Sequence, residues 1–140
     1  MSLDPAWALQ VALYEALSQD PQIRGLIGDP PRLHDAIPED AVFPLVRIGA
    51  GRIEAYSGIA GAYQHTARII AYSRYGGRKE CKAIAHAVRG VLHDARLPME
   101  HHRMVQARLV FEDHLRYRDP ETFQATMRYR FVTVPEAVAA

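Results

Sequence analysis

Seven histidines and a single cysteine are the side chains of this sequence best suited to metal binding or nucleophilic catalysis. His86 and His93 are seven positions apart, whereas paired metal ligands on one helix face are typically four apart. His101 and His102 are adjacent, so on a strand their side chains point to opposite faces. We therefore interpret the histidines as solvated surface groups, and we expect no metal and no cofactor.

Nucleophilic and acid–base catalysis also find little support in the sequence. Cys81 has no evident base, and no serine lies in the context of a nucleophile elbow. Cys81 falls on the apolar side of a predicted helix, which indicates that it is a small buried hydrophobic residue. The acids occur as adjacent pairs that suit solvation, Glu39-Asp40 and Glu112-Asp113. The sequence thus predicts that the protein is not an enzyme, with an unrecognised hydrolase as the least favoured alternative.

A glycine pair before a predicted helix is the one candidate for phosphate binding. Gly76 and Gly77 lie in the stretch YGGRK, and the N–H groups at a helix N-terminus can bind a phosphate. The stretch lacks the full phosphate-loop or dinucleotide-binding pattern. We interpret it as an ordinary turn at which the chain changes direction sharply between the preceding strand and the helix.

Arginines are the polar side chains that the strand pattern gathers on one face. Alternation along three predicted strands gives the same outward parity to Arg68, Arg74, Arg108, Arg116, Arg128 and Arg130. Three interpretations stay open: a solvated face balanced by Glu112 and Asp113, an intersubunit salt-bridge surface, or a lining that tolerates passing DNA. The net charge of +1 gives no bulk reason to expect nucleic acid or an anionic membrane as the main partner.

Two amphipathic helices are predicted to hold these strands. Residues 79–95 form the central helix, whose apolar stripe comprises Cys81, Ile84, Val88, Val91, Leu92 and Ala95. Asp4-Pro5 begins a first helix that runs to about Gln19, with an apolar stripe of Ala6, Leu9, Leu13, Ala16 and Leu17. Asp20-Pro21 begins a short helix that ends at Gly28. A short strand at 32–35 and a loop at 36–44 follow.

The strands are predicted at 45–49, 64–74, 103–117 and 123–134, with a mobile loop near 56–63. The last two form an antiparallel hairpin around a turn at Asp119-Pro120-Glu121. Inward-facing side chains are expected at Val105, Ala107, Leu109 and Phe111, and at Phe123, Ala125, Met127, Tyr129 and Phe131. Phe111 is predicted opposite Phe131, with Glu112 facing Arg130.

These elements predict an α+β fold, a mostly antiparallel β-sheet with two main α-helices packed on it, as one domain over residues 1–140. The hydrophobic content of 49% and charged content of 24% are typical of a soluble globular protein. No apolar run approaches the ~20 residues of a membrane span. The N-terminus lacks a basic region, and Asp4-Pro5 interrupts it, so we expect synthesis in the cytoplasm without a signal peptide.

Four stretches in this order and spacing resemble one protein family: ALQVALYEALSQDPQIRGLIG, HDAIPEDAVFPLVRIG, YSRYGGRKECKAIAHAVRGVLHDARL and RDPETFQATMRYRFVTVPE. Together they resemble the small tail-completion or tail-terminator proteins of tailed phages, prophages and gene transfer agents. The resemblance is especially close to versions in alphaproteobacterial gene transfer agents. It implies a non-enzymatic structural protein and carries over no catalytic residue.

The resemblance also implies partners and a place in a particle. Family members look like a sheet flanked by helices and form a hexameric ring that caps the finished tail tube and joins it to the head-side connector. DNA passes through the lumen as a non-specific contact, and no membrane is involved. The expected partners are further copies of this chain, the tail tube protein and the connector. The protein would move from the cytoplasm to the tail or neck of the particle.

Two sets of residues are candidates for assembly. The loops at 36–44 and 51–63 are the first choice for contacts with a neighbour, tube or connector, through Glu39, Asp40, Phe43, Tyr56, Ile59 and Tyr63. The second set would line the lumen or an intersubunit contact: Arg68, Arg74, Arg108, Arg128 and Arg130. The alternative function is a small nucleic-acid-binding or packaging accessory protein that uses this arginine face.

Overall fold

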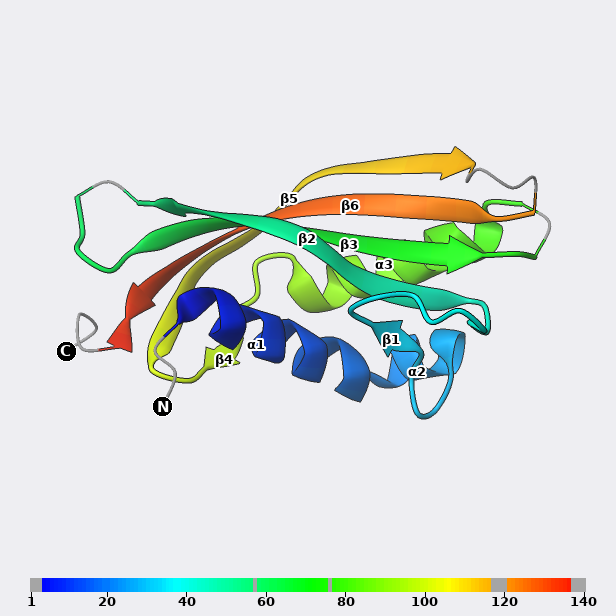
Figure 1. The fold of residues 1–140 in the computed structure, drawn as a ribbon, viewed down its shortest axis with the longest axis horizontal. Helices are drawn as coiled ribbons and strands as arrows, with labels where there is room; N and C mark the ends of the chain where they lie inside the picture. Colours follow the sequence, from blue (N-terminus) through cyan, green and yellow to red (C-terminus); the bar gives the residue numbers. More distant parts are fainter. Residues whose placement is uncertain (1–3, 57, 76, 117–120, 137–140) are drawn as a thin grey trace.

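A computed structural model describes residues 4–56, 58–75, 77–116 and 121–136 of the chain. One mixed, twisted sheet of six strands carries three helices on one face (Figure 1). The strands are ordered β1-β2-β3-β6-β5-β4, and only β1 and β2 are parallel. The elements are α1 (Pro5–Gln19), α2 (Pro21–Ile27), β1 (Leu33–His34), β2 (Leu45–Ala55), β3 (Tyr63–Ser73), α3 (Lys79–Leu92), β4 (Pro98–Met99), β5 (His102–Arg116) and β6 (Phe123–Pro135).

The first two helices begin and end where the sequence predicts. Asp4 caps α1 by accepting a hydrogen bond from the N–H of Ala6, and Asp20 caps α2 by accepting one from the N–H of Ile23. Gly28 ends α2 with a φ of 102°, a conformation that favours glycine. The central helix α3 ends at Leu92, three residues before the predicted end, because Asp94 turns to a φ of 58° and its N–H donates to the carbonyl of Ala107 in β5.

The main core lies between the helices and one face of the sheet. The stripe of α3 buries Cys81, Ile84, Val88 and Leu92 completely or nearly so, as predicted. The predicted inward side chains of β6 are also confirmed: Phe123, Ala125, Met127, Tyr129 and Phe131 all belong to this core. Strand β6 sits between β3 and β5, and its inner face is buried along nearly its whole length. The three described helices and the single parallel pair refine the expected fold without changing its α+β class.

A small second cluster lies on the opposite face of the sheet, which we call the outer face. Leu45, Ile70 and Tyr72 are buried there, packed against Ala41 and Phe43 of the loop at 36–44. That loop therefore folds over one end of its own sheet. Leu45 thus lies on the outer face with its side chain buried beneath the loop.

Strand β5 departs from the predicted alternation. Register shifts lie between Met104 and Gln106 and between Leu109 and Phe111. The second one inserts an extra residue, which transfers every later side chain to the other face. Phe111 pairs with Arg128 and lies on the outer face, 37% exposed, so its predicted inward position and its pairing with Phe131 are wrong.

The same shift moves Glu112 to the inner face. Its carboxylate forms an ion pair with Arg89 of α3 and lies 2.6 Å from Nε2 of His114. The predicted contact with Arg130 is therefore wrong, since Arg130 pairs with Arg108. The pattern missed the shift because Leu109, Val110 and Phe111 are all apolar.

Strand β2 is longer than predicted, and four predicted segments fall partly outside the described residues. A register shift between Ile48 and Gly51 lets β2 continue to Ala55. The short edge strand β4 was not predicted, whereas β1 was. The four segments that fall partly outside the described residues are the predicted loop near 56–63, the predicted strand at 103–117 and the predicted turns at 76–77 and 119–121.

Candidate assembly surfaces

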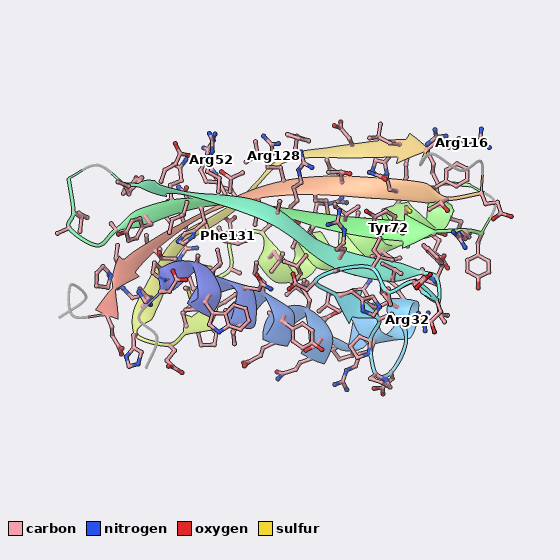
Figure 2. The ribbon with its side chains drawn as sticks, in the orientation of Figure 1. Arg32, Arg52, Tyr72, Arg116, Arg128 and Phe131 are labelled. Atoms are coloured by element: carbon pink, nitrogen blue, oxygen red, sulfur yellow. The ribbon has the colours of Figure 1, made fainter. Side chains whose placement is uncertain are left out.

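Arginines from four neighbouring strands gather on the outer face of the sheet. Arg68 of β3 pairs with Arg128 of β6, and Arg130 of β6 pairs with Arg108 of β5. Arg52 of β2 extends the row through Thr66, its partner on β3 and a neighbour of Arg130. Figure 2 shows Arg52 and Arg128 on the side of the sheet away from α1. We call Arg52, Arg68, Arg108, Arg128 and Arg130 the arginine face.

This face brings like charges together. Opposite positions in an antiparallel pair put their Cβ atoms about 4.5–5.5 Å apart, where like charges repel. The guanidinium of Arg128 stacks on the Phe111 ring at 5.0 Å. Within the described parts of the chain, none of these five arginines forms an ion pair with a carboxylate. The face therefore presents positive charge that an anion or a neighbouring subunit could neutralise.

Two of the predicted outward arginines lie elsewhere. The Nε of Arg74 donates to Oγ1 of Thr122 at 2.9 Å, and its guanidinium lies 4.0 Å from the centroid of the Phe43 ring. Arg74 therefore anchors the loop at 36–44 at one end of the sheet. The outward parity predicted for Arg116 is wrong: it pairs with Phe123 and lies over that ring on the inner face, because of the register shift in β5.

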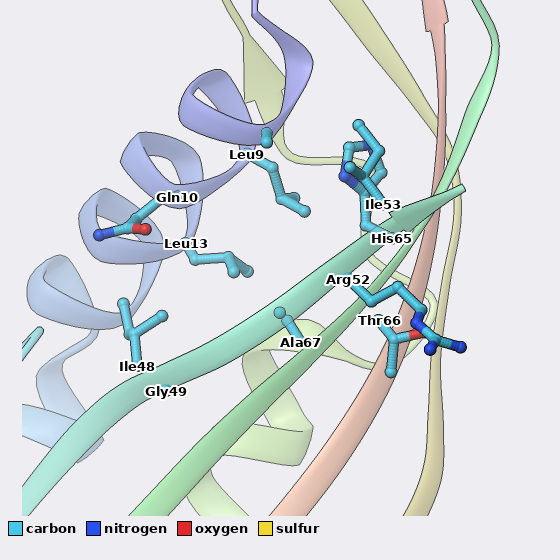
Figure 3. A pocket seen from close by; sticks show the side chains of 12 residues that line it. Leu9, Gln10, Leu13, Ile48, Gly49, Arg52, Ile53, His65, Thr66 and Ala67 are labelled. Atoms are coloured by element: carbon cyan, nitrogen blue, oxygen red, sulfur yellow. The ribbon is translucent and has the colours of Figure 1, made fainter. Parts of the chain in front are cut away.

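Arg52 was missed by the sequence reasoning. Gly49 and Gly51 interrupt the apolar alternation of β2. The predicted strand therefore ended at Gly49, although β2 continues to Ala55. The one available signal was that Arg52 precedes the apolar Ile53, which restores alternation in the second half of the strand. Figure 3 shows Arg52 and Thr66 pointing away from α1, onto the outer face.

The predicted assembly loops lie at opposite ends of the sheet. Leu45, which follows the loop at 36–44, pairs with Tyr72, whereas Ala55 at the far end of β2 pairs with Tyr63. Glu39 and Asp40 are exposed in the first loop, beside a half-buried Phe43. These candidates therefore form two separate surfaces and not one.

The second surface is the tip of the β2–β3 hairpin, which projects beyond the helices (Figure 1). Ile53, Tyr56 and Ile59 are each 42% exposed, so the tip presents three large apolar side chains to solvent. Its base is ordered by a hydrogen bond from the N–H of Tyr56 to the carbonyl of Ala62, at 2.9 Å. Tyr63 is half-buried within β3 and belongs to the base of the hairpin.

Gly61 fixes the direction of this hairpin. It has a φ of 79°, and a Cβ added there would lie 2.6 Å from Cγ of Pro135. The hairpin therefore packs tightly against the end of β6 at a position that requires glycine.

A small pocket of about 210 Å³ lies between α1 and the hairpin (Figure 3). Leu9 and Leu13 of α1 line it together with His65 of β3. His65 is 3% exposed, and its Nε2 is hydrogen-bonded to Oγ1 of Thr133 at 2.9 Å. Burial lowers the pKa of His65 to about 4, so its imidazole is neutral at physiological pH. The expected surface position of this histidine is therefore wrong.

The other side chains whose types could support catalysis or metal binding have structural positions. Cys81 is buried, its Sγ lies 3.3 Å from the carbonyl oxygen of Phe123, and burial raises the pKa of its thiol to about 11. Within residues 4–56, 58–75, 77–116 and 121–136, no group of three or more His, Cys, Asp and Glu side chains is arranged to hold a metal ion. None of the helices described is long and apolar enough to cross a membrane.

The fold and its surfaces define a class of protein: a small α+β domain whose exposed features are an apolar hairpin tip and a charged sheet face, both suited to contacts with other macromolecules. The sequence profile of the family described as "Tail completion protein gp17" matches residues 11–134. The chain therefore belongs to the tail completion protein family, as its resemblance predicted.

Among the solved structures that match, one example is similar over almost the whole chain. It is a chain from the "Virion of native gene transfer agent (GTA) particle", with a TM-score of 0.84 and 25% sequence identity. The alignment covers 94% of this chain and 98% of that chain. No curated protein gave a significant match.

Proposed function

We propose that this chain is a structural adaptor that forms a ring, expected to be hexameric, at the head-proximal end of a phage-like tail tube. The ring terminates growth of the tube and joins the tail to the head connector. The observation that carries this proposal is the match to a virion chain from end to end of both chains, together with membership of the tail completion family. The chain acts without catalysis, as a component of the particle.

The two ends of the sheet suit the two axial partners of such a ring. A subunit between a tube and a connector needs a binding surface at each end, and exposed candidates lie at both: Glu39 and Asp40 at one end, Tyr56 and Ile59 at the other. The arginine face supports a role as the lining of the lumen. Positive charge attracts the phosphates of DNA regardless of the DNA sequence, unless side chains also contact the base edges. DNA would then be a passing contact.

Removing this chain from cells that make the particle tests the function. We expect tubes without a uniform end, and filled heads that carry no tail, because nothing caps the tube or bridges it to the connector. Negative-stain imaging of the lysate measures the fraction of heads joined to tails, and expression of the chain from a second copy should restore it.

Normal joined particles without the chain would contradict the proposal. Normal particles that contain less DNA would instead favour the alternative, a packaging accessory protein that uses the arginine face. That alternative also predicts affinity of the purified chain for duplex DNA that falls steeply with added salt.

A further inference from the structure

The sheet has two long edges that are only partly covered. Strand β1 pairs with β2 only at Val46 and Arg47, and within the described chain no strand continues that pairing along residues 48–55. On the other side, β4 pairs with β5 only at His102 and Arg103. The segment after α3 then covers β5 as far as Leu109, whose N–H donates to Nδ1 of His93. The described chain offers no backbone partner on that side for residues 110–116.

Both open segments are exposed over most of their residues and are of similar length. Every residue from 50 to 55 on β2 is exposed. On β5, Val110, Phe111 and Leu115 are 43%, 37% and 49% exposed. An exposed edge with large apolar side chains is a template for pairing with another strand, and soluble proteins normally protect such edges with charge or cover them. Here the apolar side chains concentrate on the part of β5 that the described residues leave uncovered.

The directions of the strands decide which partner fits. The four long strands β2, β3, β6 and β5 alternate in direction, so β2 and β5 run in opposite directions at opposite sides of the sheet. A second copy rotated about an axis along the strands keeps its strand directions. Its β2 would therefore run antiparallel to β5 of the first copy, continuing the same pattern. Because this contact joins two different surfaces, repetition of it by a rotation that divides a full turn evenly closes a ring.

We propose that residues 110–116 of β5 pair antiparallel with residues 49–55 of β2 in a second copy of this chain. This inference rests on the ring of the proposed function and specifies the contact that closes it. It also orients the ring wall, because the helices of all copies lie on one side of the continuous sheet and the arginine faces on the other.

Charge selects a register for the paired edges. Arg52 lies opposite Thr66, and Asp113 lies opposite Thr126, so both side chains are on the outer face. Placing Asp113 of one copy opposite Arg52 of the next pairs opposite charges and sets Leu115 beside Ala50. In the same register, the exposed ring of Phe111 lies beside Glu54 and can pack on its methylene groups.

A cysteine pair tests the contact in assembled particles. The double variant Arg52→Cys/Asp113→Cys should give, on oxidation, a ladder of covalently linked subunits on a non-reducing gel. Each single variant should stay monomeric on that gel, because position 52 of one copy meets position 113 of the next. Cys81 is buried and stays unreactive. The matched control, Arg52→Cys/His86→Cys, keeps one partner and moves the other to the exposed side of α3, and it should give no ladder.

Charge exchange gives a second readout that needs no crosslink. Arg52→Asp and Asp113→Arg should each lower the yield of joined particles roughly tenfold, and the double exchange should restore it, as expected for a close pair. Particles that contain the chain but give no ladder, or a double exchange no better than either single variant, would overturn the edge pairing and leave the proposed function standing. Absence of the chain from the particles would instead overturn the proposed function.

Discussion

Replacing Tyr56 and Ile59 together by glutamate is expected to abolish the joining of tails to heads while leaving the isolated subunit folded. Both side chains are 42% exposed at the hairpin tip, so new charges there stay hydrated in the free protein. In the proposed ring the tip meets an axial partner, and two uncompensated charges would be buried in that contact. Central apolar side chains of an interface contribute about 2 kcal/mol or more each, so binding per subunit should weaken roughly a thousandfold.

The matched control is His86→Glu, which adds the same charge on the exposed side of α3, away from both ends of the sheet. It should leave the joined fraction of particles at the wild-type value. Thermal unfolding of each purified variant checks the fold, and imaging of the lysate counts joined particles. Wild-type joining by the Tyr56→Glu/Ile59→Glu variant would exclude the hairpin tip as an axial contact.

A second large effect is expected on acid stability through His65. The unfolded chain should bind a proton at the ordinary histidine pKa of 6.5, whereas burial holds the pKa in the folded protein near 4. The neutral histidine therefore costs no stability above about pH 6.5, and the free energy of unfolding falls as the pH drops from there toward 4. The full loss is about 3 kcal/mol, from about 1.4 kcal/mol for each unit of difference.

The variant His65→Gln isolates this contribution, because its amide can still bond to the Thr133 hydroxyl and does not titrate. Urea unfolding at a series of pH values gives the free energy of unfolding of each protein. The wild-type curve should fall relative to the His65→Gln curve by about 3 kcal/mol between neutral pH and pH 4. His101→Gln, at an exposed histidine, should follow the wild-type curve. Parallel curves for wild-type and His65→Gln protein would contradict the buried, neutral histidine.

The sequence predicted correctly those elements of the fold that depend only on neighbouring residues, such as helix caps and the alternation of a buried strand. The Asp-Pro pairs at 4–5 and 20–21 begin helices because aspartate accepts the first free N–H groups and proline has none to leave unpaired. Strand β6 was predicted nearly residue by residue, because it is central in the sheet and its inner face is buried without interruption. The alternation of apolar and polar residues along β6 therefore matches the alternation of buried and less buried side chains.

The partly uncovered strands β2 and β5 were predicted less well, for a physical reason. Both contain register shifts, and β1 and β4 cover them for only two residues each. A strand that lacks a second neighbour over much of its length tolerates an extra residue, because only one neighbour must keep its hydrogen bonds there. Val110 marks such a shift, yet an apolar residue between Leu109 and Phe111 leaves no trace in the polarity pattern. The error carried over to the surface: Glu112 and Arg116 turned inward and Phe111 outward, which changes the outer surface of β5.

The positions of the candidate assembly residues depend even less on the local sequence pattern. Arg52 joins the arginine face only because β2 continues past Gly51, and Glu39 and Tyr56 separate to opposite ends only because β2 runs between their loops. Sequence reasoning found the exposed loops from their composition. Their relation to each other, and the open edges of the sheet, follow from the topology.

The most direct test of the adaptor function is the position of this chain in an imaged particle. A cryo-electron microscopy reconstruction of the particle made by the cells that encode it should be calculated without imposed symmetry at the neck. We predict a closed ring of this chain between the last ring of the tail tube and the head connector, with the arginine faces toward the lumen. A particle in which that position is filled by a different chain, or in which this chain lies at the distal tip, would contradict the proposed function.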